Sequence, residues 1–208
     1  MRREKSDISS EAPVEFYNHD ATRFGERYTS VRFEDVQRGV LGHLPVPGSR
    51  VLDVGAGSGR DAFALAERGY IVTAVEPAVL LQKWARNRPE SGEVVWIEDR
   101  LPDLRKLRSL KLYFEFILCS AVLMHLPAAQ LRKSMSTFRE LLVVGGILAI
   151  SVRGKRPSDP ADVFYDLSDD EIIEAATSEG FSLIESNSHE DSLGRQEVRW
   201  RSFVFQRA

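Results

Sequence analysis

The chain has 208 residues, 43% of them hydrophobic and 28% charged, with a formal net charge of -3. This length fits one domain that buries enough apolar surface to fold without crosslinks. The acidic balance disfavours a dedicated DNA-binding protein, which needs a basic face for the phosphates. The single cysteine, Cys119, excludes an intramolecular disulfide, and no Cys/His spacing suggests a metal site.

Nothing in the sequence predicts an association with membranes. The charged N-terminus is not followed by an apolar leader segment. The longest apolar stretch, residues 141–152, contains two glycines and is too short to span a bilayer. A cytoplasmic protein is therefore expected.

The first 48 residues predict a tail and a helical cap. Residues 1–12 are polar and charged and are expected to form a flexible tail. A helix is predicted over residues 13–28, and a second over residues 33–44, where apolar side chains repeat at helical spacing. Residues 13–48 are therefore expected to form an N-terminal helical cap on the rest of a single domain, residues 13–208.

From residue 49 short apolar runs alternate with helical patterns. Strands are predicted at residues 51–54, 71–75, 94–97, 114–119 and 147–152, with helices at residues 60–68, around 80–84 and from 127 to 142. Ser168 and Glu171 form a capping-box pattern for a further helix, which Gly180 ends. Strands at 181–186 and 198–205 follow, and the short loop between them predicts antiparallel pairing.

This alternation predicts the fold class. Residues 49–208 are expected to form an α/β, Rossmann-like, doubly wound core. Its sheet is expected to be seven-stranded and mostly parallel, with the last strand antiparallel.

A glycine loop follows the first predicted strand. Asp53 is followed by Gly55, Gly57 and Gly59, and Glu76 ends the next strand about twenty positions later, where a carboxylate can accept ribose hydroxyls. Nicotinamide dinucleotides and S-adenosylmethionine both use this geometry. Asp53 would repel a pyrophosphate but suits an ammonium and a sulfonium. The loop therefore favours S-adenosylmethionine.

Residues 50–152 resemble the core of the class I S-adenosylmethionine-dependent methyltransferases, motif after motif in the same order. The resemblance implies that the glycine loop contacts the methionine portion, Glu76 the ribose and Asp99 the adenine. It also implies that residues 114–125 line the methyl-transfer site and that N-terminal tyrosines cover the cofactor. The expected cofactor contacts are Tyr17, Tyr28, Asp53, Gly55, Ala56, Gly57, Gly59, Glu76, Pro77, Asp99, Arg100, Leu101 and Ser120. Val143 and Val144 depart from the Lys-Pro pair that is common in the family.

Other polar residues have two interpretations each. His125 is either a general base near the transferred methyl group or a structural histidine with satisfied hydrogen bonds. Tyr28 either packs or contacts the cofactor, where it could contribute to catalysis, and Asp99 either contacts the cofactor or begins a turn. Arg153 and Arg195 are candidates for binding an anionic group of the substrate, although solvated arginines are more common.

The expected reaction is in-line displacement at the sulfonium methyl group, which leaves S-adenosylhomocysteine. The chain lacks the Asn-Pro-Pro-Tyr type of segment of DNA-adenine enzymes, so the expected acceptor is a small molecule. Two alternatives stay open. One is an RNA or protein methyltransferase, with a phosphate-binding face of Arg105, Lys106, Arg108 and Lys111. The other is a non-catalytic S-adenosylmethionine-binding regulator.

Overall fold

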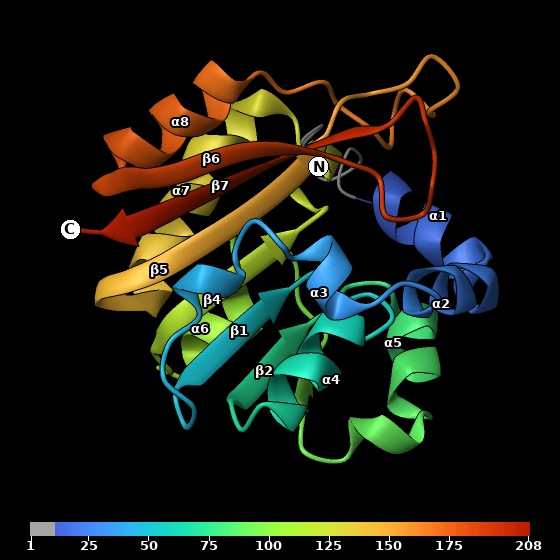
Figure 1. Ribbon diagram of the computed structural model, residues 1–208, viewed down its shortest axis with the longest axis horizontal. Helices are drawn as coiled ribbons and strands as arrows, with labels where there is room; N and C mark the ends of the chain where they lie inside the picture. The colour runs from blue at the N-terminus through green and yellow to red at the C-terminus, as the bar shows by residue number, and fades with distance from the viewer. Residues whose placement is uncertain (1–10) are drawn as a thin grey trace, which may run out of the picture.

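A seven-stranded sheet runs through the centre of the molecule (Figure 1). The computed structural model describes residues 11–208, so most of the predicted tail lies outside the described residues. The strand order is β3-β2-β1-β4-β5-β7-β6. The strands are β1 (Arg50–Val54), β2 (Ile71–Val75), β3 (Val95–Ile97), β4 (Phe114–Ser120), β5 (Leu142–Arg153), β6 (Phe181–Glu190) and β7 (Arg199–Arg207).

The pairing of the strands confirms the predicted mixed sheet. The strands from β1 to β5 pair in parallel, and β7 lies antiparallel between β5 and β6. The carboxyl ends of β1, β2, β4, β5 and β6 therefore meet at one edge of the sheet, where open α/β folds bind their ligands.

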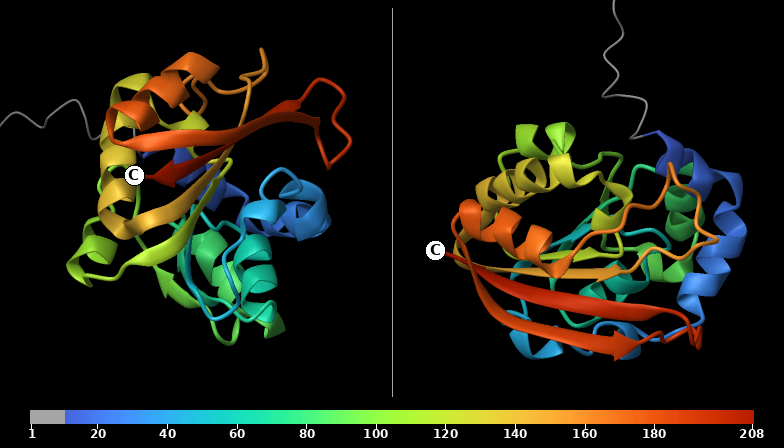
Figure 2. Two further views of the ribbon diagram at one scale, coloured as in Figure 1. Left: turned by 60° about the vertical axis from the view of Figure 1, so that its left-hand side comes forward. Right: turned by 90° about the horizontal axis from the view of Figure 1, so that it is seen from above.

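Helices cover both faces of this sheet (Figure 2). They are α4 (Arg60–Glu67), α5 (Val79–Arg86), α6 (Arg105–Ser109), α7 (Leu131–Leu141) and α8 (Asp169–Ser178). Successive strand residues alternate between the two faces. Leu52 packs in the apolar cluster under α6, α7 and α8, whereas its neighbour Val51 packs in the cluster under α4 and α5.

The N-terminal region differs from the prediction. The helix expected over residues 13–28 is two helices, α1 (Ala12–His19) and α2 (Ala21–Thr29), which Asp20 separates with a φ of -135°. The helix expected over residues 33–44 is wrong: α3 (Phe33–Val36) is followed only by the 3-10 turn η2 (Leu41–His43). A Cβ on Gly39 would lie 2.6 Å from Ser202 Oγ of β7, so contact with the sheet overrides the helical pattern here.

Several boundaries in the core also shift. Short 3-10 turns η3 (Pro89–Ser91), η4 (Leu123–His125) and η5 (Ala128–Gln130) occur in the loops, and α7 begins only at Leu131 instead of next to Pro127. The predicted capping box is confirmed, because Ser168 Oγ accepts from the Glu171 backbone N–H at 3.2 Å and Glu171 Oε2 accepts from the Ser168 backbone N–H at 2.8 Å.

The N-terminal helices and the loop between β6 and β7 lie beside the carboxyl edge of the sheet (Figures 1 and 2). α2 and α1 pack on α5. Ser192, in the β6–β7 loop, donates a hydrogen bond to the Asp35 carbonyl of α3 at 3.0 Å. Two segments far apart in the sequence therefore meet around this edge. Within residues 11–208 no helix is long and apolar enough to cross a membrane.

Candidate functional site

A cavity of about 950 Å³ opens at the carboxyl edge of the sheet. Its walls come from α1, α2, the loops after β1, β2, β3, β4 and β5, and the β6–β7 loop. Every residue predicted above to contact cofactor or substrate lines this cavity except Gly59. The volume is near the upper end for small-molecule sites, so one cavity has room for two ligands.

The glycine loop wraps tightly from β1 into α4. Gly55, Gly57 and Gly59 have φ values of 72°, 54° and 78°, which glycine adopts without strain. A Cβ on Gly55 would lie 2.3 Å from Val122 Cγ2. A Cβ on Gly59 would lie 2.5 Å from the ring of Phe63. Packing against Phe63 therefore explains why position 59 requires glycine, without a contact to a ligand.

Glu76 joins the glycine loop to the end of β2. Its Oε2 accepts a hydrogen bond from the Gly57 backbone N–H at 2.8 Å, and its Oε1 accepts from Ala78 N–H at 2.7 Å. The side chain is buried, and burial raises the pKa of its carboxyl from 4.5 to about 7, although the two hydrogen bonds oppose the rise. Each oxygen keeps a further lone pair that can accept from a hydroxyl.

Asp53 is a buried carboxylate with an unpartnered oxygen. The residue is 2% exposed, and its Oδ2 has no hydrogen-bond partner among residues 11–208. Burial, followed by the nearby charge of Asp61, holds the pKa of Asp53 well above its usual range. A cation beside Oδ2 would reverse this, so the position suits a positively charged ligand group.

A polar network that the sequence did not reveal supports this corner. Gln37 Nε2 donates to Asp61 Oδ2 at 2.7 Å and to Ser120 Oγ at 2.9 Å. Ser120 Oγ also shares a hydrogen bond with Ser151 Oγ at 2.8 Å, and Arg60 pairs with Asp61. The buried Gln37 thus connects α3 to α4 and β4. Only the place of Asp61, next to the glycine loop, signalled its involvement.

Asp99 lies on the cavity wall and also organises the backbone. Its Oδ1 accepts from Arg100 N–H and its Oδ2 from Leu107 N–H, both at 2.9 Å. Leu107 lies in α6, so the carboxylate holds the start of this helix. Both oxygens of Asp99 therefore accept backbone hydrogen bonds, as the turn interpretation predicts. Each oxygen keeps a further lone pair that a ligand can use.

His125 is held by two hydrogen bonds. Its Nδ1 lies 2.8 Å from the Val163 carbonyl oxygen, which can only accept, so Nδ1 carries the proton. Its Nε2 then accepts from the Tyr17 hydroxyl at 3.0 Å. Burial lowers the pKa of His125 to about 4. The ring is neutral at pH 7 with both nitrogens engaged, as in the structural interpretation, and this makes it a weak general base.

Tyr17 and Tyr28 form the helical side of the cavity. Tyr28 stacks on Phe24, with ring centroids 5.8 Å apart, and Phe24 in turn contacts Tyr17 at 5.0 Å. Burial raises the pKa of both tyrosines, so their hydroxyls remain protonated at neutral pH. They can donate and accept hydrogen bonds but do not supply a charge.

Arg153 and Arg195 line the cavity, but a carboxylate already partners each. Arg153 Nη1 donates to Asp159 Oδ2 at 2.6 Å, and the pair is buried. Arg195 binds Asp191 through Nε at 2.9 Å and Nη2 at 2.6 Å. Neither arginine is a solvated surface residue. Their charges are matched within the chain, which weakens them as sites for a substrate anion.

The predicted basic face on α6 is largely neutralised. Arg105 pairs with Asp103, Lys106 with Glu98 and Arg108 with Glu140. Interleaved carboxylates repel phosphates as strongly as the cations attract them. The surface around α6 therefore does not present a continuous basic patch.

Comparisons with known proteins bear on the core. A family model described as a methyltransferase domain matches residues 51–146. The matched residues hold the core of a class I methyltransferase fold. The match holds the glycine loop, Glu76, Asp99 and His125, whereas α1, α2 and the β6–β7 loop lie outside it.

Curated relatives match part of this chain. The ubiquinone biosynthesis O-methyltransferase of Coxiella burnetii is 32% identical over 108 residues, 52% of this chain and 45% of that protein. The chain spans about half the length of the curated relatives it matches.

Solved structures with the same fold contain the cofactor or its product. Magnesium protoporphyrin IX methyltransferase of Synechocystis PCC 6803, with bound S-adenosylhomocysteine, superposes with a TM-score of 0.69 at 17% identity over 96% of this chain and 100% of that one. The glycopeptide N-methyltransferase MtfA, with S-adenosylmethionine, gives 0.67 at 18% identity over 86% and 97%. At these identities the likeness establishes the fold.

Proposed function

We propose that the chain is an S-adenosylmethionine-dependent methyltransferase that acts on a small molecule. The observation that carries the proposal is the buried Asp53 carboxylate at the glycine loop, whose Oδ2 lacks a partner in the described part of the chain. A ligand ammonium there would supply the missing hydrogen bond and the missing charge. Residues 13–48 would act as the helical cap of the single domain, over a core of residues 49–208.

The other lining residues fit the remaining parts of the cofactor. Glu76 has lone pairs free for the ribose hydroxyls, and the loop of Asp99, Arg100 and Leu101 offers a wall for the adenine. Gly55, Ala56, Gly57 and Pro77 would contact the cofactor through main chain and small side chains. Ser120, Tyr17 and Tyr28 would surround the reacting end.

The bound cofactor would supply an activated methyl group on a positively charged sulfur. Transfer of that methyl group to a lone pair of the acceptor would leave a neutral thioether on the cofactor. The chain's contribution is orientation and exclusion of water, worth up to about 7–11 kcal/mol in model reactions. Tyr17, fixed by His125, and the cap helices serve that purpose.

The walls of the cavity support a small acceptor. α1, α2 and the β6–β7 loop contribute walls of the cavity in addition to the glycine loop. A nucleic acid or a protein segment would need an open groove, and the basic residues on α6 are paired with carboxylates. The named relatives act on different compounds, so they do not identify the acceptor.

Thermal unfolding with added ligands tests the proposal. S-adenosylmethionine and S-adenosylhomocysteine should each raise the Tm, by about 2.7 kcal/mol of stability at a hundred times the Kd, whereas NAD should not. Asp53→Asn should abolish the shift, and Arg32→Gln, an exposed change outside the cavity, should keep it. A Tm shift with NAD alone would refute the proposed cofactor. Cofactor binding without methyl transfer to any compound in a small-molecule panel would favour the regulator.

A further inference from the structure

We propose that the acceptor is an aromatic acid, whose ring lies on an apolar wall of the cavity and whose anionic group binds Arg27. This inference rests on the proposed function and names the substrate class of the same site. It replaces Arg153 and Arg195, the arginines expected from the sequence, with a residue that the sequence did not single out.

The apolar wall is the third hydrophobic cluster of the protein. It consists of Met124, Val163 and Phe164, with Phe16, Trp200 and two alanines packed against them. All its members line the cavity, unlike the two clusters that fill the interior under the helices. Binding of a flat apolar ring is favourable here, because the ring displaces water from an apolar and aromatic surface.

The rings of this wall are held in place by their neighbours. Phe16 and Phe164 meet edge to face, with centroids 5.9 Å apart, and the guanidinium of Arg153 lies 4.4 Å from the centre of the Phe164 ring. Trp200 donates from Nε1 to Asp191 Oδ1 at 2.8 Å. A bound ring therefore meets a surface that is already ordered, which reduces the entropic cost of binding.

Arg27 lies at the end of α2, half-buried in the same cavity. Its guanidinium has no hydrogen-bond or ion-pair partner within the described part of the chain, in contrast to Arg60, Arg153 and Arg195. A partly desolvated guanidinium without a carboxylate suits an anionic ligand, because the charge-assisted bond has no internal competitor.

The charges around Tyr28 point the same way. Burial raises the pKa of this tyrosine, and Tyr17 together with the positive charges of Arg27, Arg195 and Arg153 opposes the rise. Asp159 and Asp191 already balance two of these arginines. The third, Arg27, has no such carboxylate among the described residues, so its charge stays unbalanced near Tyr28.

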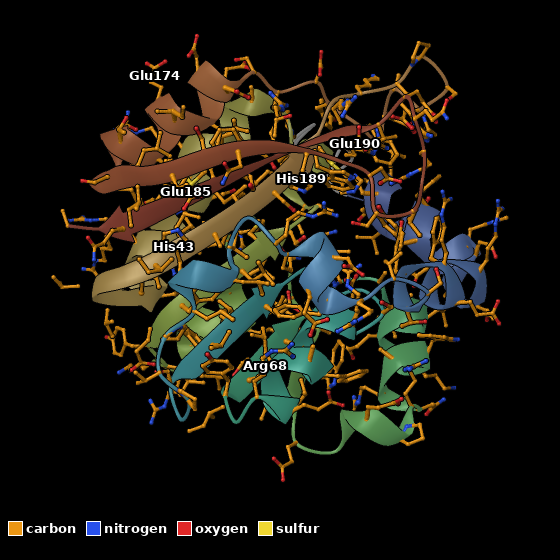
Figure 3. The ribbon with its side chains drawn as sticks, in the orientation of Figure 1. His43, Arg68, Glu174, Glu185, His189 and Glu190 are labelled. Atoms are coloured by element: carbon orange, nitrogen blue, oxygen red, sulfur yellow. The ribbon has the colours of Figure 1, made fainter. Side chains whose placement is uncertain are left out.

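His189 also lines the cavity, but it does not supply a positive charge that would attract the anion away from Arg27. It lies near the carboxyl end of β6, beside Trp200 in the β6–β7 ladder (Figure 3). Burial lowers its pKa, so the ring is neutral at pH 7. Glu15 and Asp162, which have no ion-pair partner within residues 11–208, are exposed to solvent, whereas Arg27 is half-buried.

Calorimetric titration of the full chain, saturated with S-adenosylhomocysteine, tests the inference with three probes. Naphthoate carries ring and anion, naphthamide is its neutral counterpart, and hexanoate carries the anion without the ring. Naphthoate should bind about tenfold or more tightly than either of the others. Arg27→Gln should remove its advantage over naphthamide, and Arg32→Gln should preserve it. Phe16→Ala should weaken both naphthyl probes to the same degree.

Equal binding of naphthoate and naphthamide overturns the inference, as does an unchanged preference in Arg27→Gln or no binding of any naphthyl probe. These outcomes count only against the acceptor class when S-adenosylhomocysteine still binds. Failure of the wild-type chain to bind S-adenosylhomocysteine would instead refute the proposed function. Arg27→Gln should leave the affinity for S-adenosylhomocysteine unchanged, which separates loss of an anion site from loss of the fold.

Discussion

The burial of Glu76 makes the stability of the ligand-free protein depend on pH. The carboxyl pKa is 4.5 in the unfolded chain and about 7 in the folded protein. The folded state therefore holds the proton more tightly. The stabilisation is complete below pH 4.5 and is lost as the pH rises through about 7. At about 1.4 kcal/mol per pH unit, Glu76 alone accounts for about 3 kcal/mol.

Urea unfolding of the wild type and of Glu76→Gln, measured between pH 4.5 and 8, detects this effect. The free energy of unfolding of the wild type should fall by about 3 kcal/mol relative to the variant across the range, about 6–12 °C in Tm. The comparison is needed because the lowered pKa of His125 has the opposite sign and raises stability with pH. Loss of one backbone hydrogen bond in the variant adds an offset that does not vary with pH. A constant difference between the two proteins would refute the reasoning.

Two further substitutions probe the packing around the site. Gly55→Ala places a Cβ 2.3 Å from Val122 Cγ2 at a φ of 72°, so the Tm of this variant should fall by several degrees. In the control Gly92→Ala the new Cβ meets no described atom within 4 Å, so the Tm should stay nearly unchanged. Equal Tm values for the two variants would contradict the packing argument. Tyr17→Phe removes the donor to His125 Nε2 and should lower the free energy of unfolding in urea by about 1 kcal/mol. The NMR signals of the His125 ring should change in this variant. Unchanged signals would mean that the hydrogen bond does not form in solution.

Local patterns were sufficient to predict the sheet and the glycine loop. β2 covers residues 71–75 as predicted, because an apolar run bounded by polar residues defines a buried parallel strand. Asp53 and Glu76 follow from the same reasoning, since the end of a strand fixes where its side chains lie. These features depend on residues close together in the chain.

Features that depend on distant partners were not predicted. The two hydrogen bonds of His125 come from residues 108 and 38 positions away, so the sequence left its role undecided. The helix predicted over residues 33–44 fails because Gly39 meets β7, which is far away in the sequence. Arg153 and Arg195 lie at the cavity as expected, but their pairing with Asp159 and Asp191 emerged only from the folded loops.

The place of β7 between β5 and β6 has a consequence for the order of folding. Among the described strands, β6 pairs only with β7, although it precedes β7 in the chain. During synthesis on the ribosome, β6 and the β6–β7 loop must therefore wait until residues 199–207 have emerged. Until then β5 exposes an unpaired edge that can pair with another chain. Chaperone binding to the nascent chain should accordingly be strongest after β5 is made and should end when β7 docks.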